Sequence, residues 1–372
     1  MEWQGILFWT AVAIAGAFAC SVLARVVWRL RSELQIRKAG PRRLSSSRHR
    51  IWRDPGPPTA ETMRFGPGGR EGAPRPPFRF VEEHLTGSQP CVAVRDAANR
   101  LWRVKWGHEV RPESFAVRMA HALGYFAEVT HYVEDGLIDG AENLTRAKNC
   151  IDPDCRFREA RFELEDPDVR MHFNEHSWSW DDNPFVGTPQ LSGLKLLVML
   201  VSNWDTKDRR DVARGSNTAI FEHRVSRWAR EARYLITDWG GAMGKWGTNV
   251  VSRGRWDPDG FETQTPQFVT GVREDGIVTF GYVGQRTGDV AYDIPVDHVR
   301  WFYELASRLT EDHLREGLRA SGADEEEANR FARAILQRIA QLGRCQVSGD
   351  GYKVSGDGFQ DGASRSVLTP VS

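Results

Sequence analysis

The chain has 372 residues, of which 27% are charged and 40% hydrophobic, and its formal net charge is +0. This composition is typical of one or two globular domains and excludes a collagen-like or wholly disordered chain. A zero net charge provides no overall basic field that would attract nucleic acid, so we expect no nucleic-acid partner. The five cysteines are few and odd in number, which favours a reducing compartment over a disulfide framework.

The first distinctive segment is Gly5 to Ala24, a run without a charged residue. Twenty residues of helix span about 30 Å, the thickness of a bilayer core. Residues 25–53 then contain ten Lys or Arg and one acid, whereas Glu2 is the only charged side chain before the run. This distribution predicts a single-pass anchor, residues 1–28, in the cell (inner) membrane with the rest of the chain in the cytoplasm. A cleaved signal peptide would carry its basic residues on the other side of the run.

Residues 29–79 are interpreted as a linker that is first basic and then rich in proline and glycine. Pro and Gly make up 12 of the 24 residues from Asp54 to Pro77, which predicts an extended segment. Globular patterning begins at about residue 80. Hydrophobic periodicity and turn residues predict four strands, at 91–95, 101–106, 125–133 and 161–164, and a helix at 112–123.

The second half of the chain is expected to be mostly helical. Residues 191–201 are apolar on nearly all sides, which predicts a central buried helix. Further helices are expected at 296–308, 310–320 and 324–342, the last of which starts with acidic residues that favour a helix N-terminus. Residues 344–372 are expected to form a flexible tail.

Three polar residues in this half have an order that is typical of a phosphoryl-transfer site. Asp205 lies on a polar loop, Asn217 opens an apolar strand, and Asp238 follows a second apolar strand in an Asp-Trp-Gly sequence. In such a site one carboxylate orients the attacking hydroxyl, while an Asn and a second Asp hold Mg²⁺ against the phosphates. Each residue alone is typical of a turn or a helix cap, so the prediction depends on their order.

This order resembles that of the atypical kinase superfamily, in particular the HipA-like toxin kinases and the phosphatidylinositol 3/4-kinase-like proteins. The resemblance covers residues 80–343 and implies an α+β, two-lobed protein-kinase-like fold preceded by one transmembrane helix. An N-lobe at 80–165 would contain an antiparallel sheet and a helix, and a C-lobe at 166–343 would be mostly helical. Adenine would then lie between the lobes, near residues 162–166.

The resemblance also implies a role for eight positions. Asp205 would be the catalytic acid, Lys207 would assist at the γ-phosphate, and Asn217 and Asp238 would be the Mg²⁺ ligands. ATP would be held by the strand lysine Lys105, with Glu113 on the following helix as its acidic partner. A turn at Gly87 and Ser88 would lie over the phosphates.

Two of these assignments have rivals in the sequence. Glu109 could replace Glu113 as the partner of Lys105, and Asp208 could replace Asp205 as the catalytic acid. Twelve residues separate Asp205 from Asn217, which is longer than the compact loop of HipA-like kinases.

The resulting prediction is a membrane-anchored, Mg²⁺-dependent kinase that transfers the ATP γ-phosphoryl group to a hydroxyl acceptor. The acceptor could be a protein, a lipid or a small molecule. Two alternatives remain open: a catalytically inactive pseudokinase or nucleotide-binding scaffold, and a structural domain that binds peptide through its tryptophan-rich surface.

Overall fold

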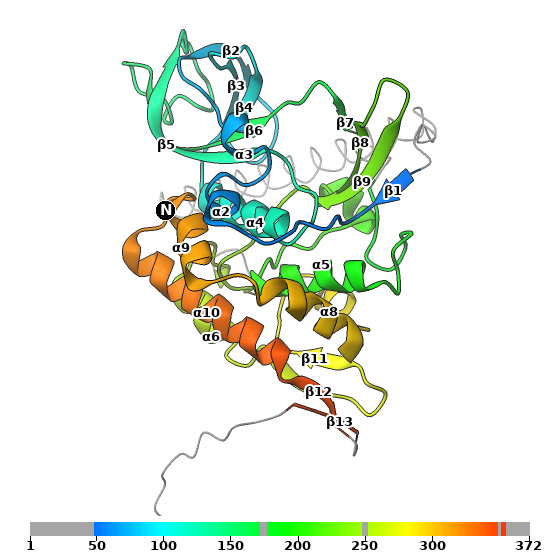
Figure 1. The fold of residues 1–372 in the computed structure, drawn as a ribbon. Helices are drawn as coiled ribbons and strands as arrows, with labels where there is room; N and C mark the ends of the chain where they lie inside the picture. Colours follow the sequence, from blue (N-terminus) through cyan, green and yellow to red (C-terminus); the bar gives the residue numbers. More distant parts are fainter. Residues whose placement is uncertain (1–47, 172–176, 248–251, 349–350, 355–372) are drawn as a thin grey trace, which may run out of the picture.

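A computed structural model describes residues 48–171, 177–247, 252–348 and 351–354. The fold is mixed α/β, with a closed five-stranded barrel, a four-stranded sheet beside it, and a group of helices below them in the view of Figure 1. The two larger hydrophobic cores lie among the helices and inside the barrel.

The barrel is built from the first half of the described chain, in the strand order β2-β3-β4-β6-β5. Its strands are β2 (Phe78–His84), β3 (Cys91–Arg95), β4 (Leu101–Lys105), β5 (Thr130–Asp139) and β6 (Arg156–Leu164). Neighbouring strands are antiparallel except at the closure, where β2 pairs with β5 in parallel, Phe78 with Ile138 and Arg79 with Asp139. Helix α4 (Val110–Ala122) connects β4 to β5 and packs beneath the barrel (Figure 1).

Large aromatic side chains fill the interior of this small barrel. Trp102, Phe157 and Phe162 are almost fully buried, and Phe162 contacts Trp102 edge to face and Phe157 at a tilt. Side chains alternate between the two faces of a strand, so the residues between them, such as Arg103 and Glu163, lie on the outer face. Gly136 lets β5 pass close to Phe157, because a Cβ atom at this glycine would lie 2.8 Å from the ring.

The second sheet has the order β1-β9-β8-β7 and surrounds a central hairpin. Its strands are β1 (Arg48–Arg50), β7 (Val169–Met171), β8 (Thr218–Arg224) and β9 (Arg230–Ile236). β1 joins β9 in parallel, and β7 joins β8 in antiparallel orientation. The connection 165–168 leads directly from the barrel into this sheet.

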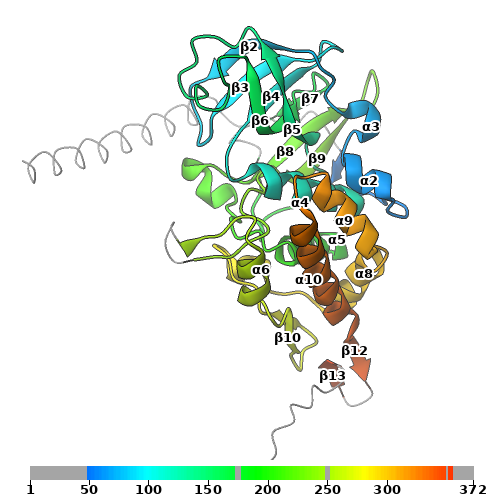
Figure 2. The same ribbon diagram turned by 90° about the vertical axis from the view of Figure 1, so that its left-hand side faces the viewer.

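The helices surround α5 (Pro189–Leu200), which is buried along most of its length (Figures 1 and 2). Thr188 caps its first turn by accepting a hydrogen bond from the Leu191 amide, and Pro189 occupies the first turn. The other elements are α2 (Ala60–Phe65), α3 (Gly69–Gly72), η1 (Arg209–Arg214), α6 (Pro258–Gln264), β10 (Val269–Val272), β11 (Val278–Phe280), α7 (Thr287–Val290), α8 (Val296–Ala306), α9 (Glu311–Arg319), α10 (Glu325–Gly343), β12 (Cys345–Ser348) and β13 (Gly351–Val354).

Most predicted elements are present, with shifted ends. The strand predicted at 125–133 begins only at Thr130 and extends to Asp139, and the strand predicted at 161–164 begins at Arg156. The segment 54–77 is less extended than expected, since it contains α2 and α3. Met63 of α2 is fully buried, and this helix packs against α4 and α9. Residues 345–348 and 351–354, expected in the tail, form the antiparallel strands β12 and β13.

The predicted fold class is wrong. A two-lobed kinase-like fold with a twisted antiparallel N-terminal sheet was expected, but the parallel pairing of β2 with β5 closes that sheet into a barrel. Long, strongly twisted strands bring the end of β5 back to the start of β2, and the periodicity of each strand does not reveal this.

The predicted membrane topology is corrected as well. Among the residues that the structure describes, no helix has the length and apolar character needed to cross a bilayer. The predicted anchor, Gly5 to Ala24, lies outside the described residues. The assignment to the inner membrane as a single-pass protein therefore has no support from the structure.

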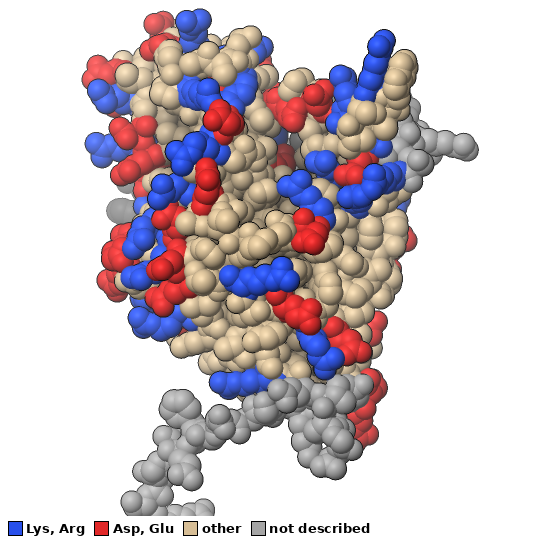
Figure 3. Space-filling model, in the orientation of Figure 1, with Lys and Arg blue, Asp and Glu red and all other residues tan. Residues whose placement is uncertain are grey.

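Charges of both signs are distributed over the surface. On the face in Figure 3, Lys and Arg lie among Asp and Glu and do not gather into one patch. Many arginines of the described chain pair with acids of neighbouring elements, such as Arg319 with Glu325 at 2.8 Å. Exposed pairs of this kind contribute little stability each.

Candidate functional site

The ends of the β8–β9 hairpin bring two of the predicted site residues together. Thr218 pairs with Ile236 in the antiparallel register, so Asn217 before β8 and Asp238 after β9 lie at the same end. The amide of Thr237 donates a 2.9 Å hydrogen bond to the Asn217 carbonyl. The adjacency of Asn217 and Asp238 therefore follows from the hairpin register.

The loop after α5 adds Asp205 to this pair. The Asn217 side-chain amide donates to the Asp205 backbone carbonyl at 2.7 Å, and the Asn203 side-chain amide donates to the Asp238 backbone carbonyl at 3.2 Å. The Trp204 amide also donates to the Gly241 carbonyl at 3.3 Å. These bonds connect the loop to the residue before β8 and to the residues after β9. Asp205, Asn217 and Asp238 therefore form one cluster, called here the carboxylate cluster.

The Asp205 carboxyl has an oxygen without a partner. Its Oδ1 is buried and accepts no hydrogen bond from the described residues, while Oδ2 lies 3.2 Å from the Lys207 ammonium. Burial raises the pKa of Asp205, Lys207 opposes this shift, and the charge of Asp238 adds to it. A buried carboxylate oxygen without a donor is costly, so this atom is a candidate ligand contact.

Glu109 lies beside the same cluster, immediately before α4. Gly240 permits its close approach, because a Cβ atom there would lie 2.6 Å from Glu109 Cγ. Burial raises the pKa of Glu109, Asp238 and Asp205 raise it further, and Arg255 and Arg161 oppose the shift. The Arg255 guanidinium lies 3.4 Å from the Glu109 carboxylate. Three carboxyl groups thus share one region, and the negative charge of Asp238 contributes to the raised pKa of both Glu109 and Asp205.

The structure separates the two rival aspartates. Asp208 is fully buried and caps η1, accepting a hydrogen bond from the Arg210 amide at 2.9 Å. Its carboxylate also accepts from the Arg210 side chain and lies 3.8 Å from Arg286. Asp208 is therefore committed to local structure, whereas Asp205 keeps a free oxygen.

Lys105 does not pair with Glu113. Its ammonium lies 3.2 Å from Glu163, which also binds Arg103 and Arg161 on the outer face of the barrel. Glu113 instead forms an ion pair with Arg161. The register explains this partner choice, because Arg103 faces Glu163 and Lys105 faces Arg161 across β4 and β6. The predicted Lys105–Glu113 pair is replaced by a network in which Arg161 links the two acids.

This network strongly favours an ionised Glu163. Burial opposes ionisation, but Lys105, Arg103 and Arg161 together hold the pKa of Glu163 well below its usual range. Glu128 lies nearby, and burial together with the charge of Glu163 raises its pKa. The pKa values of these two neighbouring carboxyl groups are therefore shifted in opposite directions, down for Glu163 and up for Glu128.

Gly87 and Ser88 lie in the turn between β2 and β3, at the same end of the barrel as Lys105. Cys91 pairs with Lys105 across β3 and β4. The Arg146 guanidinium donates to the carbonyls of Thr86 and Gly87 at 2.8 and 2.9 Å. The turn is exposed, and the hydrogen bonds of its backbone to Arg146 hold it on the barrel.

A cavity of about 800 Å³ opens between the barrel and the β8–β9 hairpin. Its walls include Leu164, Glu165 and Asp166 of the segment where adenine was predicted. Phe126, Phe221 and Leu235 form a buried apolar cluster that lines it. Arg103 also lines the cavity and connects it, through Glu163, to Lys105.

Sequence reasoning missed the central acid of the network, Glu163, and its partner Arg161. The signal was present in Arg161-Phe162-Glu163-Leu164, where charged residues alternate with buried ones on a central strand. Arg161 and Glu163 are both buried, so each needs an opposite charge nearby. Arg103 and Lys105 on β4 supply it for Glu163, and Glu113 on α4 supplies it for Arg161.

The acids alone do not make an all-protein metal centre. Among the described residues, no group of three or more His, Cys, Asp and Glu side chains is placed to hold a metal ion. Asn217 and Asp238 could still provide two ligands to Mg²⁺, which commonly takes one or two protein oxygens besides phosphates and water.

No protein-family model, curated protein or solved structure matches this chain. The resemblance to kinases and to ATP-binding proteins therefore has no support from relatives, and the functional argument depends on the site itself.

Proposed function

We propose that this chain transfers a phosphoryl group from ATP to a hydroxyl acceptor at the carboxylate cluster. The observation that carries the proposal is the convergence of Asp205, Asn217 and Asp238, with the buried Asp205 Oδ1 left without a partner. The cavity of about 800 Å³ between the barrel and the β8–β9 hairpin has a volume suited to a nucleotide, and Leu235 of its wall lies on the strand that leads to Asp238.

The residues present fit a magnesium–nucleotide complex. The Asn217 amide nitrogen is occupied by the Asp205 carbonyl, which leaves its oxygen for a cation. The Asp238 Oδ1 accepts from the Gly240 amide at 2.9 Å, which leaves Oδ2. These two oxygens would hold Mg²⁺, which when bound neutralises charge on the phosphates.

Asp205 supplies the base in this proposal. Its carboxylate takes the proton of the acceptor hydroxyl as the oxygen–phosphorus bond forms. The bond from the γ-phosphorus to the bridging oxygen breaks, and ADP leaves with the electron pair. Lys207, at 3.2 Å from Asp205, offers positive charge beside the transferred group, and Lys105 is the candidate contact for the remaining phosphates.

The test uses the full chain with ATP and Mg²⁺. Thermal unfolding measures binding, because a ligand at 100 times its Kd adds about 2.7 kcal/mol to the free energy of unfolding. Release of inorganic phosphate and mass spectrometry of the chain measure transfer to water and to the protein itself. Binding without transfer would favour the nucleotide-binding scaffold, and absence of both would refute the proposal.

A further inference from the structure

Two consecutive glycines that follow the β8–β9 hairpin, Gly240 and Gly241, let side chains of two other segments approach closely. A Cβ atom at Gly240 would lie 2.6 Å from Glu109 Cγ. A Cβ atom at Gly241 would lie 2.8 Å from Asn203 Oδ1 and 3.0 Å from Asp205 Cβ. Both positions need glycine, because a Cβ atom would collide with these groups. The turn therefore contacts both Glu109 and the loop that carries Asp205.

Two buried oxygens in this loop lack a hydrogen-bond donor. Asn203 is 1% exposed, and its Oδ1 accepts no hydrogen bond from the described residues. The same holds for Asp205 Oδ1. Buried acceptors without donors are costly, and amide and carboxylate oxygens are ligands that hard divalent cations prefer. Besides the number of acids, these two oxygens therefore point to a cation, with its bound water, at the carboxylate cluster.

Glu109 forms an ion pair with Arg255 at 3.4 Å. The guanidinium of Arg255 lies 4.8 Å from the ring centre of Trp204, the residue before Asp205. Glu109 directly precedes α4, and its side chain makes no cap hydrogen bond there. The Glu109 carboxylate is thus engaged by an arginine beside the cluster and is not needed to hold the helix end.

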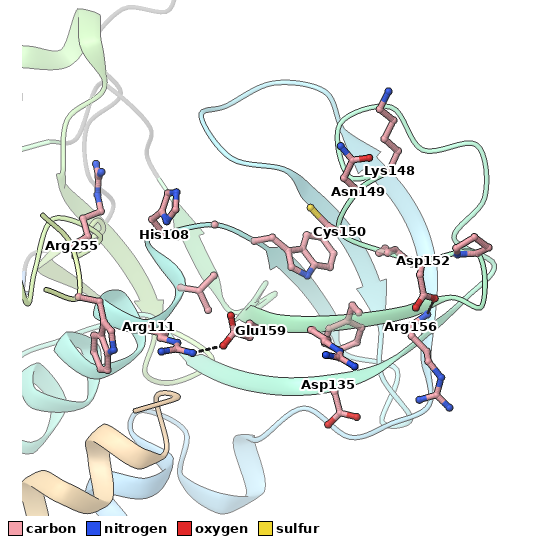
Figure 4. A pocket seen from close by; sticks show the side chains of 18 of the residues that line it. His108, Arg111, Asp135, Lys148, Asn149, Cys150, Asp152, Arg156, Glu159 and Arg255 are labelled. Atoms are coloured by element: carbon pink, nitrogen blue, oxygen red, sulfur yellow. Dashed lines mark hydrogen bonds and ion pairs between the residues drawn. The ribbon is translucent and has the colours of Figure 1, made fainter. Parts of the chain in front are cut away.

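Arg255 has open space on its other side. It lines a cavity of about 1010 Å³, and Figure 4 shows Arg255 and His108 at the same end of this cavity, away from Lys148. The Arg255 side chain is 27% exposed. An arginine that loses its carboxylate at such a position can turn its charge to water, which avoids the cost of a buried, unpaired cation.

We propose that Glu109 serves the cation site as a third acid, through water bound to the cation, and that Arg255 holds Glu109 in the cation-free protein. The direct ligands are Asn217 and Asp238, so the inference rests on the proposed function. Mg²⁺ commonly keeps several waters, and outer-shell partners change metal affinity about 10–100-fold. A contact through water agrees with the finding that the described acids form no direct all-protein metal centre.

The proposal predicts opposite effects for the two partners. Glu109→Gln removes the third acid and should weaken cation binding about tenfold or more. Arg255→Gln frees Glu109 and removes a positive charge, so it should tighten binding about threefold or more. The gain should shrink in the double variant, because Arg255 acts in part through Glu109. A purely structural ion pair would not give a gain when Arg255 is removed.

Electron paramagnetic resonance of free Mn²⁺ measures the binding, with the full chain and without nucleotide. Mn²⁺ takes the same kinds of oxygen ligand as Mg²⁺. The matched controls are Glu311→Gln and Arg273→Gln, which remove the same charges from the surface pairs Glu311–Arg315 and Arg273–Asp275. Each control should change the affinity by less than about twofold, because salt screens distant surface charges. Thermal unfolding without metal verifies that all variants fold.

The outcomes separate this inference from the proposed function. Absence of Mn²⁺ binding by the wild type, or binding that Asp238→Asn leaves unchanged, would refute the cation site itself. Binding that Asp238→Asn weakens and Glu109→Gln does not would refute the role of Glu109 and keep the site. An Arg255→Gln variant that binds Mn²⁺ no more tightly than the wild type would also overturn the proposal, because the pair would then be a structural support only.

Discussion

The side-chain amide of Asn217 donates a 2.7 Å hydrogen bond to the backbone carbonyl of Asp205, twelve residues earlier in the chain. The separation looked long for a compact site. The intervening residues fold out of the way as the 3₁₀ helix η1, which Asp208 caps. One hydrogen bond thus joins the loop after α5 to the residue before β8. The helix η1 between them makes the connection compact.

Asp205 and Asp208 are predicted to have separable roles. Asp205→Asn should keep nucleotide binding and lose turnover by about 10²–10⁴-fold, because proton transfer matters mainly in the transition state. Asp208→Asn should lower the free energy of unfolding by about 2 kcal/mol or more, because it removes the buried negative charge that Arg210 and Arg286 contact. Phosphate release and urea unfolding measure the two effects. A stable Asp208→Asn variant without turnover would reverse the assignment.

The Glu163 network is predicted to be the main electrostatic support of the barrel's outer face. Glu163→Gln leaves Arg103, Lys105 and Arg161 without their shared carboxylate, and should cost about 3 kcal/mol in urea unfolding. Glu165→Gln is the matched control, since Glu165 is partly exposed and lies 3.6 Å from Arg103. Its cost should stay below about 1 kcal/mol. Equal costs for the two variants would show that the network contributes no special stability.

Stability should fall with acid partly through His131. This side chain is buried next to Trp102, and burial, assisted by Arg118 and Arg100, lowers its pKa to about 3. The folded-state pKa lies below the unfolded value of about 6.5. Above about pH 6.5, His131 therefore does not lower the free energy of unfolding. As the pH falls from there toward about 3, His131 lowers the free energy of unfolding by up to about 1.4 kcal/mol per pH unit.

The check is the pH slope of the free energy of unfolding between pH 7.5 and 5 for wild type and for His131→Phe. The variant should have the shallower slope, whatever its absolute stability, because it removes one group that takes up a proton on unfolding. Identical slopes would show that folding does not shift the pKa of His131.

Gly136→Ala should destabilise the barrel by about 1–3 kcal/mol, because the new methyl group would collide with the Phe157 ring. Gly288→Ala is the control, since a Cβ atom at Gly288 meets nothing within 4 Å. Differential scanning calorimetry should show a lower Tm only for the first variant. Adding Phe157→Leu should recover part of the loss; failure of that rescue would mean that the ring is not the obstacle.

Local features of the sequence determined many elements of this protein. The apolar composition of residues 191–201 was sufficient to predict α5, and Asp324 with the acids after it marked the start of α10. Caps and periodicity act within a few residues, so they can be read without knowing the fold. The positions of Asn217 and Asp238 at two strand ends also pointed to their proximity.

The tertiary structure alone decided the closure of the barrel and the partners of the charges. The pairing of β2 with β5 depends on the accumulated twist of strands far apart in sequence, which no single segment encodes. Lys105 binds Glu163 and not Glu113 because β4 and β6 are adjacent in one register. The strength of an ion pair depends on the distance between the two charged groups, and packing of the folded chain sets that distance. The order of the residues in the sequence does not reveal it.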